Sequence, residues 1–432
     1  MAFNTAISGL RAASSDLNVI GNNIANASTT GFKSSVAEFA DVYASSVVGG
    51  GQNSAGSGVL LADVAQQFSQ GNISFTNNAL DLAINGTGFF ITSAQGERGY
   101  TRSGLFSLDR EGYIISNNGA NLQGFSSTGA GGLDSDLSNM QIQTGNLEPI
   151  RTTEIRSLLN LDASALPPTT APFDPQNTDT FNNATSISVF DSQGNSHVMT
   201  QYFVKEAALN TWTMNVKIDD QDIGPGSPAT LQSYTLVFND DGTLSTTQPL
   251  AAVTNWTPVN ASGNPNGSAV GDGALTAFPF PDPLTSSNFV INLTGTTQFG
   301  GAFSVNDLTQ NGFAQGRLAG IDISADGSLF ARYTNGQSRS LGKVALAAFN
   351  NEQGLSPQGN SSWAETFESG SPKVGVPSTA ALGVIQSGAL EDSNVELSEE
   401  LVALIVAQRN FQANAKTIET ESAVTQSIIS LR

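Results

Sequence analysis

At 432 residues the chain is long for one compact domain, and its length favours two or three domains that each bury a core. Its 17 basic side chains against 37 acidic ones give a formal net charge of −20, which argues against nucleic acid and anionic membranes as partners. The absence of cysteine excludes disulfides, thiolate nucleophiles and cysteine-ligated zinc or iron–sulfur clusters.

Residues 1–30 carry the pattern of an amphipathic helix. Its larger apolar residues are spaced alternately by four and three positions along one narrow stripe: Phe3, Ile7, Leu10, Leu17 and Ile24. The pattern predicts a helix of about 20 residues, which should end in the asparagine-rich segment that follows. Arg11 is the only basic residue in this stretch, so a cleavable secretory leader is not expected. Since no run of about 18 apolar residues occurs, we expect no membrane insertion.

The middle of the chain changes to the shorter period that is typical of strands. Asp-Gly and Asn-Gly pairs predict hairpin turns at residues 241–242, 326–327 and 335–336. Segments rich in glycine, proline, serine or asparagine have the composition of linkers at residues 45–58, 164–183 and 262–283. We therefore expect β-rich blocks, while the pattern leaves the fold of residues 205–285 open.

Residues 395–432 carry a second and longer helical stripe. Its apolar residues follow the heptad spacing of a coiled coil: Leu397, Leu401, Leu404, Phe411, Ile418 and Ile429. Either Ser398, which precedes Glu399 and Glu400, or Asn394 could begin the helix. We expect a helix from about residue 395 to 430, roughly 55 Å long.

Candidate catalytic residues are scarce. His197, the single histidine, has no recognisable nucleophile motif near it in sequence, so we expect a structural or solvent-exposed role. The turn sequences lack the pattern of a calcium loop, and Gly86–Phe90 lacks the third glycine of a dinucleotide-binding motif. We therefore expect no catalytic, cofactor-binding or metal-ligating residues, and a chain that is not an enzyme.

The two terminal stripes point to assembly. Each buried leucine, isoleucine or phenylalanine contributes roughly 1.5–3 kcal/mol, whereas ordering the backbone costs about 1–2 kcal/mol per residue before hydrogen bonds offset it. A helix of about 20 residues with so few apolar residues is marginal alone. An apolar helical face usually packs on its own domain, but here a glycine-rich segment separates the first helix from the body. We predict that the two ends pair with each other and with other subunits.

Both ends resemble one protein family. Residues 6–33 (AISGLRAASSDLNVIGNNIANASTTGFK) closely resemble the N-terminal signature of flagellar rod and hook proteins. The matching C-terminal signature resembles residues 390–401 (LEDSNVELSEEL) and 408–416 (QRNFQANAK). Hook and distal rod proteins share sequences similar to residues 80–90 (LDLAINGTGFF) and 100–109 (YTRSGLFSLD). The length favours the hook branch, as do residues 189–197 (VFDSQGNSH), 335–338 (NGQS) and 341–346 (LGKVAL).

The resemblance implies a multidomain fold with α-helical coiled-coil termini and two β-rich domains, the outer one inserted into the inner one. We expect an N-terminal helix in residues 1–30, a linker segment in 31–70, the inner β domain in 71–145 and 286–365, the outer β domain in 146–285, a second linker segment in 366–394 and the C-terminal helix in 395–432.

The resemblance also implies a function. Hook proteins are exported by the flagellar type III apparatus without a cleavable signal peptide, and they polymerise outside the cell under a cap. Their curved hollow tube acts as a universal joint between rod and filament. The implied partners are further copies of the chain, the distal rod protein, the hook cap and the hook–filament junction protein, with no cofactor.

Two alternatives stay open. A distal rod or other flagellar axial protein shares most of the signatures. More remotely, the β-rich middle would also suit a secreted carbohydrate-binding or hydrolytic protein, which would have to work as a monomer with both termini deleted.

Overall fold

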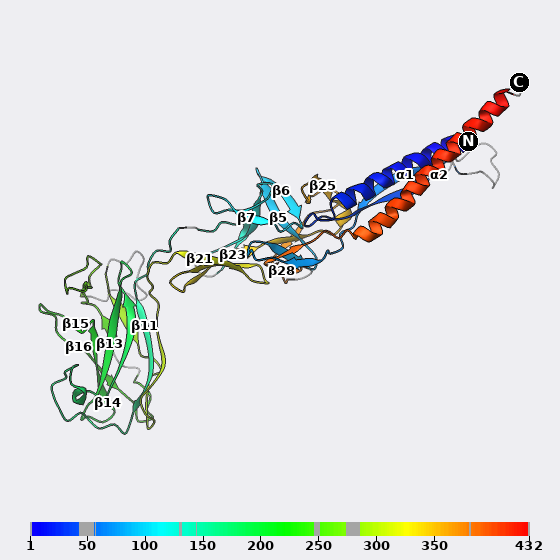
Figure 1. Ribbon diagram of the computed structural model, residues 1–432. Coiled ribbons are helices and arrows are strands. Elements are labelled where there is room, and N and C mark those ends of the chain that lie inside the picture. The colour runs from blue at the N-terminus through cyan, green and yellow to red at the C-terminus, as the bar shows by residue number, and fades with distance from the viewer. Residues whose placement is uncertain are drawn as a thin grey trace. The chain divides into compact units, whose positions relative to one another are not determined.

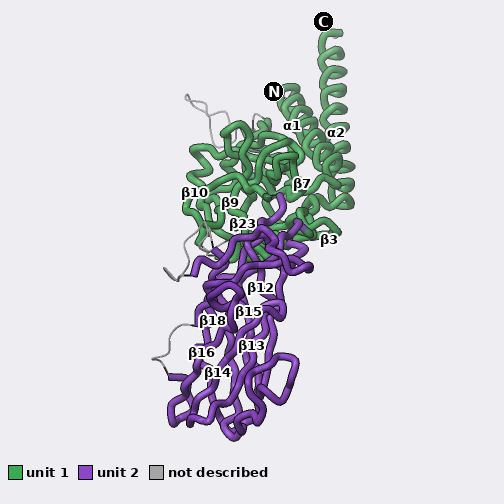
Figure 2. The backbone as a smooth tube through the Cα atoms, turned by 90° about the vertical axis from the view of Figure 1, so that its left-hand side faces the viewer, with its two compact units in different colours: residues 1–144, 319–332, 338–432 green, residues 145–318, 333–337 purple. Residues whose placement is uncertain are grey.

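The computed structural model consists of two compact units (Figures 1 and 2). It describes residues 2–42, 56, 58–128, 132–143, 145–245, 251–273, 286–379 and 382–430. Unit 1 contains residues 1–144, 319–332 and 338–432, and unit 2 contains residues 145–318 and 333–337.

Unit 1 contains both terminal helices, α1 (Ala2–Ala25) and α2 (Leu397–Ser430), which confirms the two predicted helices. They lie side by side with the two chain ends at the same end of the pair, so they are antiparallel (Figure 1). The side chain of Asn26 donates a hydrogen bond to the backbone oxygen of Asn22 just after α1 ends, which is the competition with helical hydrogen bonds expected of asparagine. Within the described residues, no helix combines the length and the apolar character needed to span a membrane.

The remainder of unit 1 is β-structure. Its strands are β1 (Ser35–Asp41), β2 (Val59–Gln66), β3 (Ile73–Phe75), β4 (Leu82–Asn85), β5 (Phe89–Ala94), β6 (Glu97–Thr101), β7 (Phe106–Leu108), β8 (Ile114–Ser116), β9 (Asn121–Ser127), β10 (Leu133–Asn139), β21 (Leu318–Ile323), β22 (Ser328–Tyr333), β23 (Ser338–Val344), β24 (Leu346–Ala348), β25 (Ser356–Gly359), β26 (Ser362–Ala364), β27 (Lys373–Gly375), β28 (Val384–Ser387) and β29 (Ala389–Glu391). The main sheet runs in the order β21-β22-β23-β9-β5-β6-β26-β25. Its core contains Phe89, Tyr100, Phe349 and Trp363, whose rings meet edge to face.

The predicted turns at residues 326–327 and 335–336 join β21 to β22 and β22 to β23. Gly327 and Gly336 have φ values of 78° and 79°. A residue with a Cβ atom adopts this left-handed conformation only at a cost, which explains glycine at both positions.

Unit 2 is a sandwich of two sheets. Its elements are β11 (Glu154–Asp162), a short 3-10 helix η1 (Thr178–Thr180), β12 (Asn183–Phe190), β13 (Ser196–Lys205), β14 (Thr211–Ile218), β15 (Gln221–Asp222), β16 (Gln232–Val237), β17 (Ala251–Val253), β18 (Phe289–Asn292), β19 (Thr297–Phe299) and β20 (Ser304–Gln310). One sheet has the order β17-β18-β11-β19 with β20 also on β11, and the other has the order β12-β13-β14-β15 with β16 also on β14. Phe203, Trp212 and Phe289 are completely buried in the shared core. Alternating side chains of both sheets supply this core, as expected for a sandwich.

The structure differs from three expectations about domain organisation. The segments 31–70 and 366–394, expected as linkers, contain strands β1 to β2 and β27 to β29. Unit 2 continues past residue 285 to residue 318, because β18, β19 and β20 all pair with β11 and complete its sheet, and it also includes residues 333–337. Of the linker-like stretches, residues 45–58 lie almost entirely outside the described residues, as does the second half of 262–283.

The remaining linker-like stretch, residues 164–183, is part of unit 2. There Phe173 and Phe181 pack against Tyr202, with ring centroids 5.2 and 5.1 Å from that of the tyrosine. The prolines of this stretch therefore shape a loop on the sandwich and do not separate two domains.

The candidate assembly site on the terminal helices

The two helices form an antiparallel pair with a defined register. The amide of Asn23 in α1 donates a hydrogen bond to Glu400 in α2, with Nδ2 and Oε1 2.9 Å apart. Further along, a Cβ atom placed on Gly9 would lie only 2.6 Å from Oδ1 of Asn414. The helices therefore approach closely at Gly9, where a side chain would meet the Asn414 amide.

The structure brings some of the predicted stripe residues together. Six of them are half-buried in the pair: Leu10, Leu17, Ile24, Leu404, Phe411 and Ile418. Ile7 lies instead in a groove between α1 and β2, beside Leu60 and Leu61. The remaining four are exposed: Phe3, Leu397, Leu401 and Ile429.

The most deeply buried apolar residues of the pair are not those of the predicted stripes. Ala6, Ala13 and Ile20 in α1 and Ala407 in α2 are each less than a tenth exposed. The α1 residues are spaced by seven, so a heptad signal was present in the sequence. The stripe of large apolar residues does not include these positions, because two of the three are alanines.

Exposed apolar residues of α2 form a surface that α1 does not cover, which we call the outer face. Five of them lie on the flanks and back of α2, away from the side that Ala407 buries: Leu397, Leu401, Val402, Ile405 and Val406. Three more lie on the end of α2 that α1 does not reach: Val424, Ile428 and Ile429. All eight are 45–69% exposed. Ala407 is 1% exposed, whereas Ile405 is 64% exposed. These two residues lie about 200° apart around a helix, so Ile405 points away from the side that Ala407 buries. A helix that is apolar on both sides normally has neighbours on both sides.

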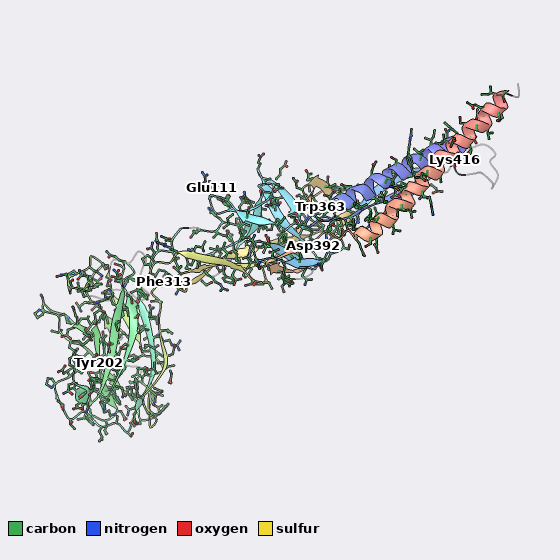
Figure 3. All side chains as sticks on the ribbon, viewed as in Figure 1. Glu111, Tyr202, Phe313, Trp363, Asp392 and Lys416 are labelled. Carbon is green, nitrogen blue, oxygen red and sulfur yellow. The ribbon has the colours of Figure 1, made fainter. Side chains whose placement is uncertain are left out.

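The outer face continues beyond α1. The register set by the Asn23–Glu400 and Gly9–Asn414 contacts places the start of α1 near Glu421. Residues 422–430 of α2 therefore extend past α1, as Figure 1 shows. Lys416, which forms a surface ion pair with Glu419, precedes this extension (Figure 3).

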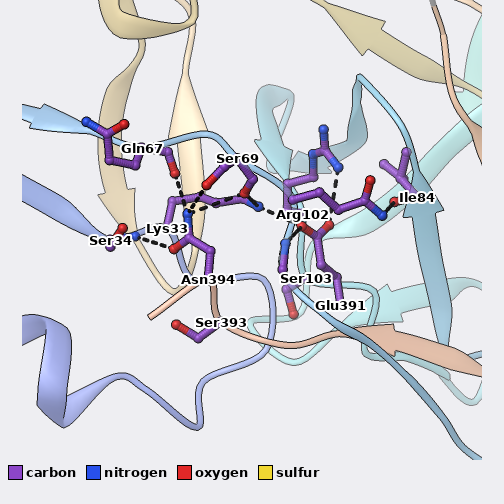
Figure 4. A network of polar contacts seen from close by, with 12 residues as sticks. Lys33, Ser34, Gln67, Ser69, Ile84, Arg102, Ser103, Glu391, Ser393 and Asn394 are labelled. Carbon is purple, nitrogen blue, oxygen red and sulfur yellow. Dashed lines mark hydrogen bonds and ion pairs between the residues drawn. The ribbon is translucent and has the colours of Figure 1, made fainter. Parts of the chain in front are cut away.

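Three buried charged residues lie where the helices join the β-structure of unit 1 (Figure 4). We call Lys33, Arg102 and Glu391 the junction cluster. The Nζ atom of Lys33 is 2.6 Å from Oε1 of Glu391, and Nη1 of Arg102 is 3.2 Å from Oε2 of the same carboxylate. All three side chains are at most 4% exposed. Burial lowers the pKa of Lys33, and the attraction of Glu391 opposes that shift only in part.

Asn394 reinforces the same junction. Its Oδ1 accepts a hydrogen bond of 2.7 Å from the backbone of Ser34, and its amide donates one of 2.7 Å to the backbone oxygen of Gln67. The backbone oxygen of Ser69 accepts hydrogen bonds from both Asn394 and Lys33 (Figure 4). These hydrogen bonds connect the segment that follows α1, the segment that precedes α2 and the segment that follows β2.

A second network of buried polar side chains lies in unit 2, around His197. His197 is 4% exposed, and its ring nitrogens lie 2.6 Å from a carboxylate oxygen of Asp219 and 3.3 Å from one of Asp191. The same Asp191 oxygen accepts hydrogen bonds from Asn195, Asn266 and Ser268. Among the described residues, no group of three or more histidine, aspartate or glutamate side chains is arranged to hold a metal ion.

Protein-family models match most of the chain in consecutive segments. They are the flagella basal body rod protein at residues 3–33, the flagellar hook protein FlgE/F/G D1 domain at 83–156, the flagellar basal body protein FlaE D2 domain at 160–313 and the flagellar basal body rod FlgEFG protein C-terminal at 386–431.

Individual proteins give the same result. The chain is 37% identical to the flagellar hook protein FlgE of Escherichia coli K12 and 36% identical to that of Salmonella typhimurium, with all of both chains covered in each case. Its fold resembles the crystal structure of Helicobacter pylori flagellar hook protein FlgE2 with a TM-score of 0.52 at 12% identity, over 74% of this chain and all of that one. On these grounds the chain belongs to the flagellar hook protein family.

Proposed function

We propose that this chain is the structural subunit of a bacterial flagellar hook, polymerising into a curved hollow tube that acts as a universal joint and passes motor torque from rod to filament. The proposal is supported by full-length similarity to hook proteins. The observation that carries it is the outer face of α2, which has no partner within the described part of the chain.

The energetics of the outer face favour contacts with several further copies of the same chain. Complete burial of a leucine, isoleucine or valine contributes about 1.5–3 kcal/mol, so half-exposed side chains retain roughly 1 kcal/mol each for an intermolecular contact. The whole outer face then offers on the order of 8 kcal/mol, while association costs roughly 4–15 kcal/mol. A single contact is therefore weak. A helical polymer, in which each subunit has several neighbours, makes the same surface sufficient.

The proposed tube has three layers. Residues 1–30 and 395–432 form an inner coiled-coil tube around the export channel, through the outer face and the predicted stripe residues. The β-structure of unit 1 forms the middle layer. Unit 2 is an outer domain inserted into the inner one, which is supported by its position in the sequence between two parts of unit 1 and by its own closed core.

The division into layers also suggests how the tube bends. Apolar helix contacts in the inner layer resist the loss of subunits. Charged residues make up only 12% of the chain, and a polar outer surface exchanges hydrogen bonds with water at little net cost, so neighbouring outer domains can slide. The glycine-rich residues 49–58, which would allow the layers to shift, lie almost entirely outside the described residues.

The place and partners of the subunit belong to the same proposal. It is extracellular, exported by the flagellar type III apparatus, and it meets the distal rod protein, the hook cap and the hook–filament junction protein. The family is a structural one, and we assign the chain no catalytic role. The use of both His197 ring nitrogens by Asp191 and Asp219 supports that assignment.

Electron microscopy of the purified, self-assembled chain tests the proposal. The full chain should form curved tubes, and a variant lacking residues 1–25 should form none while both β-rich units stay folded by circular dichroism. A matched full-length control is Leu209→Asp, which changes a residue that is 91% exposed in unit 2. Normal tubes from the truncated chain would refute the proposal. Straight tubes from the full chain would favour a rod protein, and glycan binding by the truncated monomer would favour a secreted binding protein.

A further inference from the structure

Two residues of the junction cluster, Lys33 and Glu391, lie where the chain passes between the helix pair and the β-structure of unit 1. Lys33 follows the end of α1, and Glu391 is the last residue of β29, shortly before α2 begins. Arg102 directly follows β6, a strand of the main sheet. One carboxylate thus holds a cation from the N-terminal connection and a cation from the β-structure (Figure 4).

The surroundings of the carboxylate make this arrangement specific. The backbone N–H of Gly71 donates a hydrogen bond of 3.0 Å to Oε1 of Glu391, and the N–H of Gly31 donates one of 2.8 Å to its backbone oxygen. The Arg102 guanidinium also lies 5.3 Å from the centroid of the Phe89 ring. A shift of either connection would leave a buried charge without its partner.

Buried ion pairs contribute little net stability, because desolvation of the charges offsets their attraction. They can instead select one arrangement, because every other arrangement leaves a charge unpaired. Geometry makes that selection important here. α2 has 34 residues and is about 50 Å long, so a tilt of about 10° at its base moves its far end by roughly 9 Å. That displacement equals the usual spacing of roughly 8–10 Å between packed helices.

We propose that the junction cluster is a positioning device that fixes the direction in which the helix pair leaves the β-structure of unit 1, and thereby determines where the outer face meets neighbouring subunits. Its effect on assembly rests on the proposed hook function. Its effect on the free subunit does not, so the two can be tested separately.

The free subunit is tested with the triple variant K33M/R102M/E391M, which replaces the charges by apolar side chains of similar length. Nitroxide labels at Arg110→Cys and Arg409→Cys, both exposed, report the direction of α2, and the natural chain has no competing cysteine. We expect an unchanged melting temperature but a distance distribution that shifts or broadens by several ångströms. An unchanged narrow distribution would overturn the proposal. Asn394→Ala removes the side-chain hydrogen bonds to Ser34 and Gln67 and should change the distance distribution less. This variant replaces the triple variant in the test if the triple variant does not fold.

Assembly is tested by cryo-electron microscopy of tubes from the same variants. We expect loss of tubes or a changed helical symmetry. The matched control is K343M/D326M, which removes a partly exposed ion pair of 2.6 Å in the same unit and should leave the symmetry unchanged. Wild-type symmetry from the triple variant would refute the positioning role in assembly while leaving the hook function standing. Failure of the unmodified chain to form tubes would instead refute the hook function.

Discussion

Unit 2 buries its largest apolar side chains, whereas the helix pair of unit 1 leaves many apolar side chains exposed. In unit 2 two sheets face each other, and Phe203, Trp212 and Phe289 between them are completely buried. In the helix pair Ile405 is 64% exposed and Ile429 is 69% exposed. Unit 2 can therefore fold on its internal contacts, whereas the pair leaves part of its apolar surface exposed, as surfaces that bind other molecules often are.

The contrast predicts that different residues determine the folding of the subunit and its assembly. Substitutions in the core of unit 2 should act on stability and only indirectly on polymers. Substitutions on the outer face of α2 should act on polymers and hardly on the free subunit.

The largest effect is expected from Ile405→Asp. A carboxylate in the middle of the outer face would be buried without a partner at every inner contact, which typically costs about 3–5 kcal/mol. We expect tubes to disappear at concentrations where the unmodified chain assembles, measured by sedimentation and electron microscopy. The melting temperature of the free subunit should hardly change, because the residue is exposed there.

The control for Ile405→Asp is Glu399→Asp, which keeps the charge of an exposed residue at the start of α2 and should leave assembly unaltered. Normal tubes from Ile405→Asp would contradict the assignment of the outer face. A large drop in its melting temperature would mean that this face is already packed within the free subunit.

The next effect is expected from Trp212→Ala in the core of unit 2. The substitution leaves a large cavity and removes the hydrogen bond of 3.1 Å that the indole donates to Gln298. Such changes cost about 3–5 kcal/mol, so unit 2 should melt earlier in calorimetry while the helical signal of α1 and α2 persists. Phe367→Ala, at a residue that is fully exposed in unit 1, is the control and should leave the melting curve unchanged. Simultaneous loss of both signals would show that the two regions do not fold independently.

The helices could be predicted because their signal is local. A period of 3.6 with large apolar residues is visible without any knowledge of the fold, and both helices begin and end within a few residues of the expected positions. The interface within the pair could be predicted only in part. Alanines such as Ala13 and Ala407 fill it, and small side chains become interface residues only once a second helix is close enough to touch them.

The junction could not be predicted from sequence. Lys33 and Glu391 are 358 positions apart, and no local pattern in either segment indicates that they touch. Asn394 was considered as the start of the C-terminal helix, but α2 begins at Leu397 and the Asn394 side chain binds Ser34 and Gln67. A polar residue between a strand and a helix fits several roles, and only the fold decides among them.

The boundary of unit 2 was missed for a related reason. The proline- and glycine-rich residues before position 285 have the composition of a linker, yet β18 beyond them pairs in parallel with β11. Parallel pairing requires a long connection between the strands, so a loop-rich segment inside a domain has the composition of a linker between domains.

The smallest effect is expected from Asp191→Asn, which alters the buried polar network around His197 in unit 2. Burial alone would raise the pKa of Asp191, but hydrogen bonds from Ser268, Asn195 and Asn266 outweigh it and hold the pKa well below its usual value. The unfolded chain therefore takes up this proton first as the pH falls. The stability that Asp191 contributes is complete above about pH 4 and is lost as the pH drops further.

The amide introduced by Asp191→Asn cannot accept all the hydrogen bonds that converge on the carboxylate, so the substitution should cost about 1–3 kcal/mol near neutral pH. It should also flatten the acid side of the stability curve, measured by urea unfolding from neutral pH to about pH 3. Asp134→Asn, at an exposed aspartate of unit 1, should leave both quantities unchanged. If Asp191→Asn left the acid side as steep as before, the acid sensitivity of unit 2 would have to come from other carboxylates. The apolar core of unit 2 would then account for the contrast without an acid-sensitive contribution from the polar network around His197.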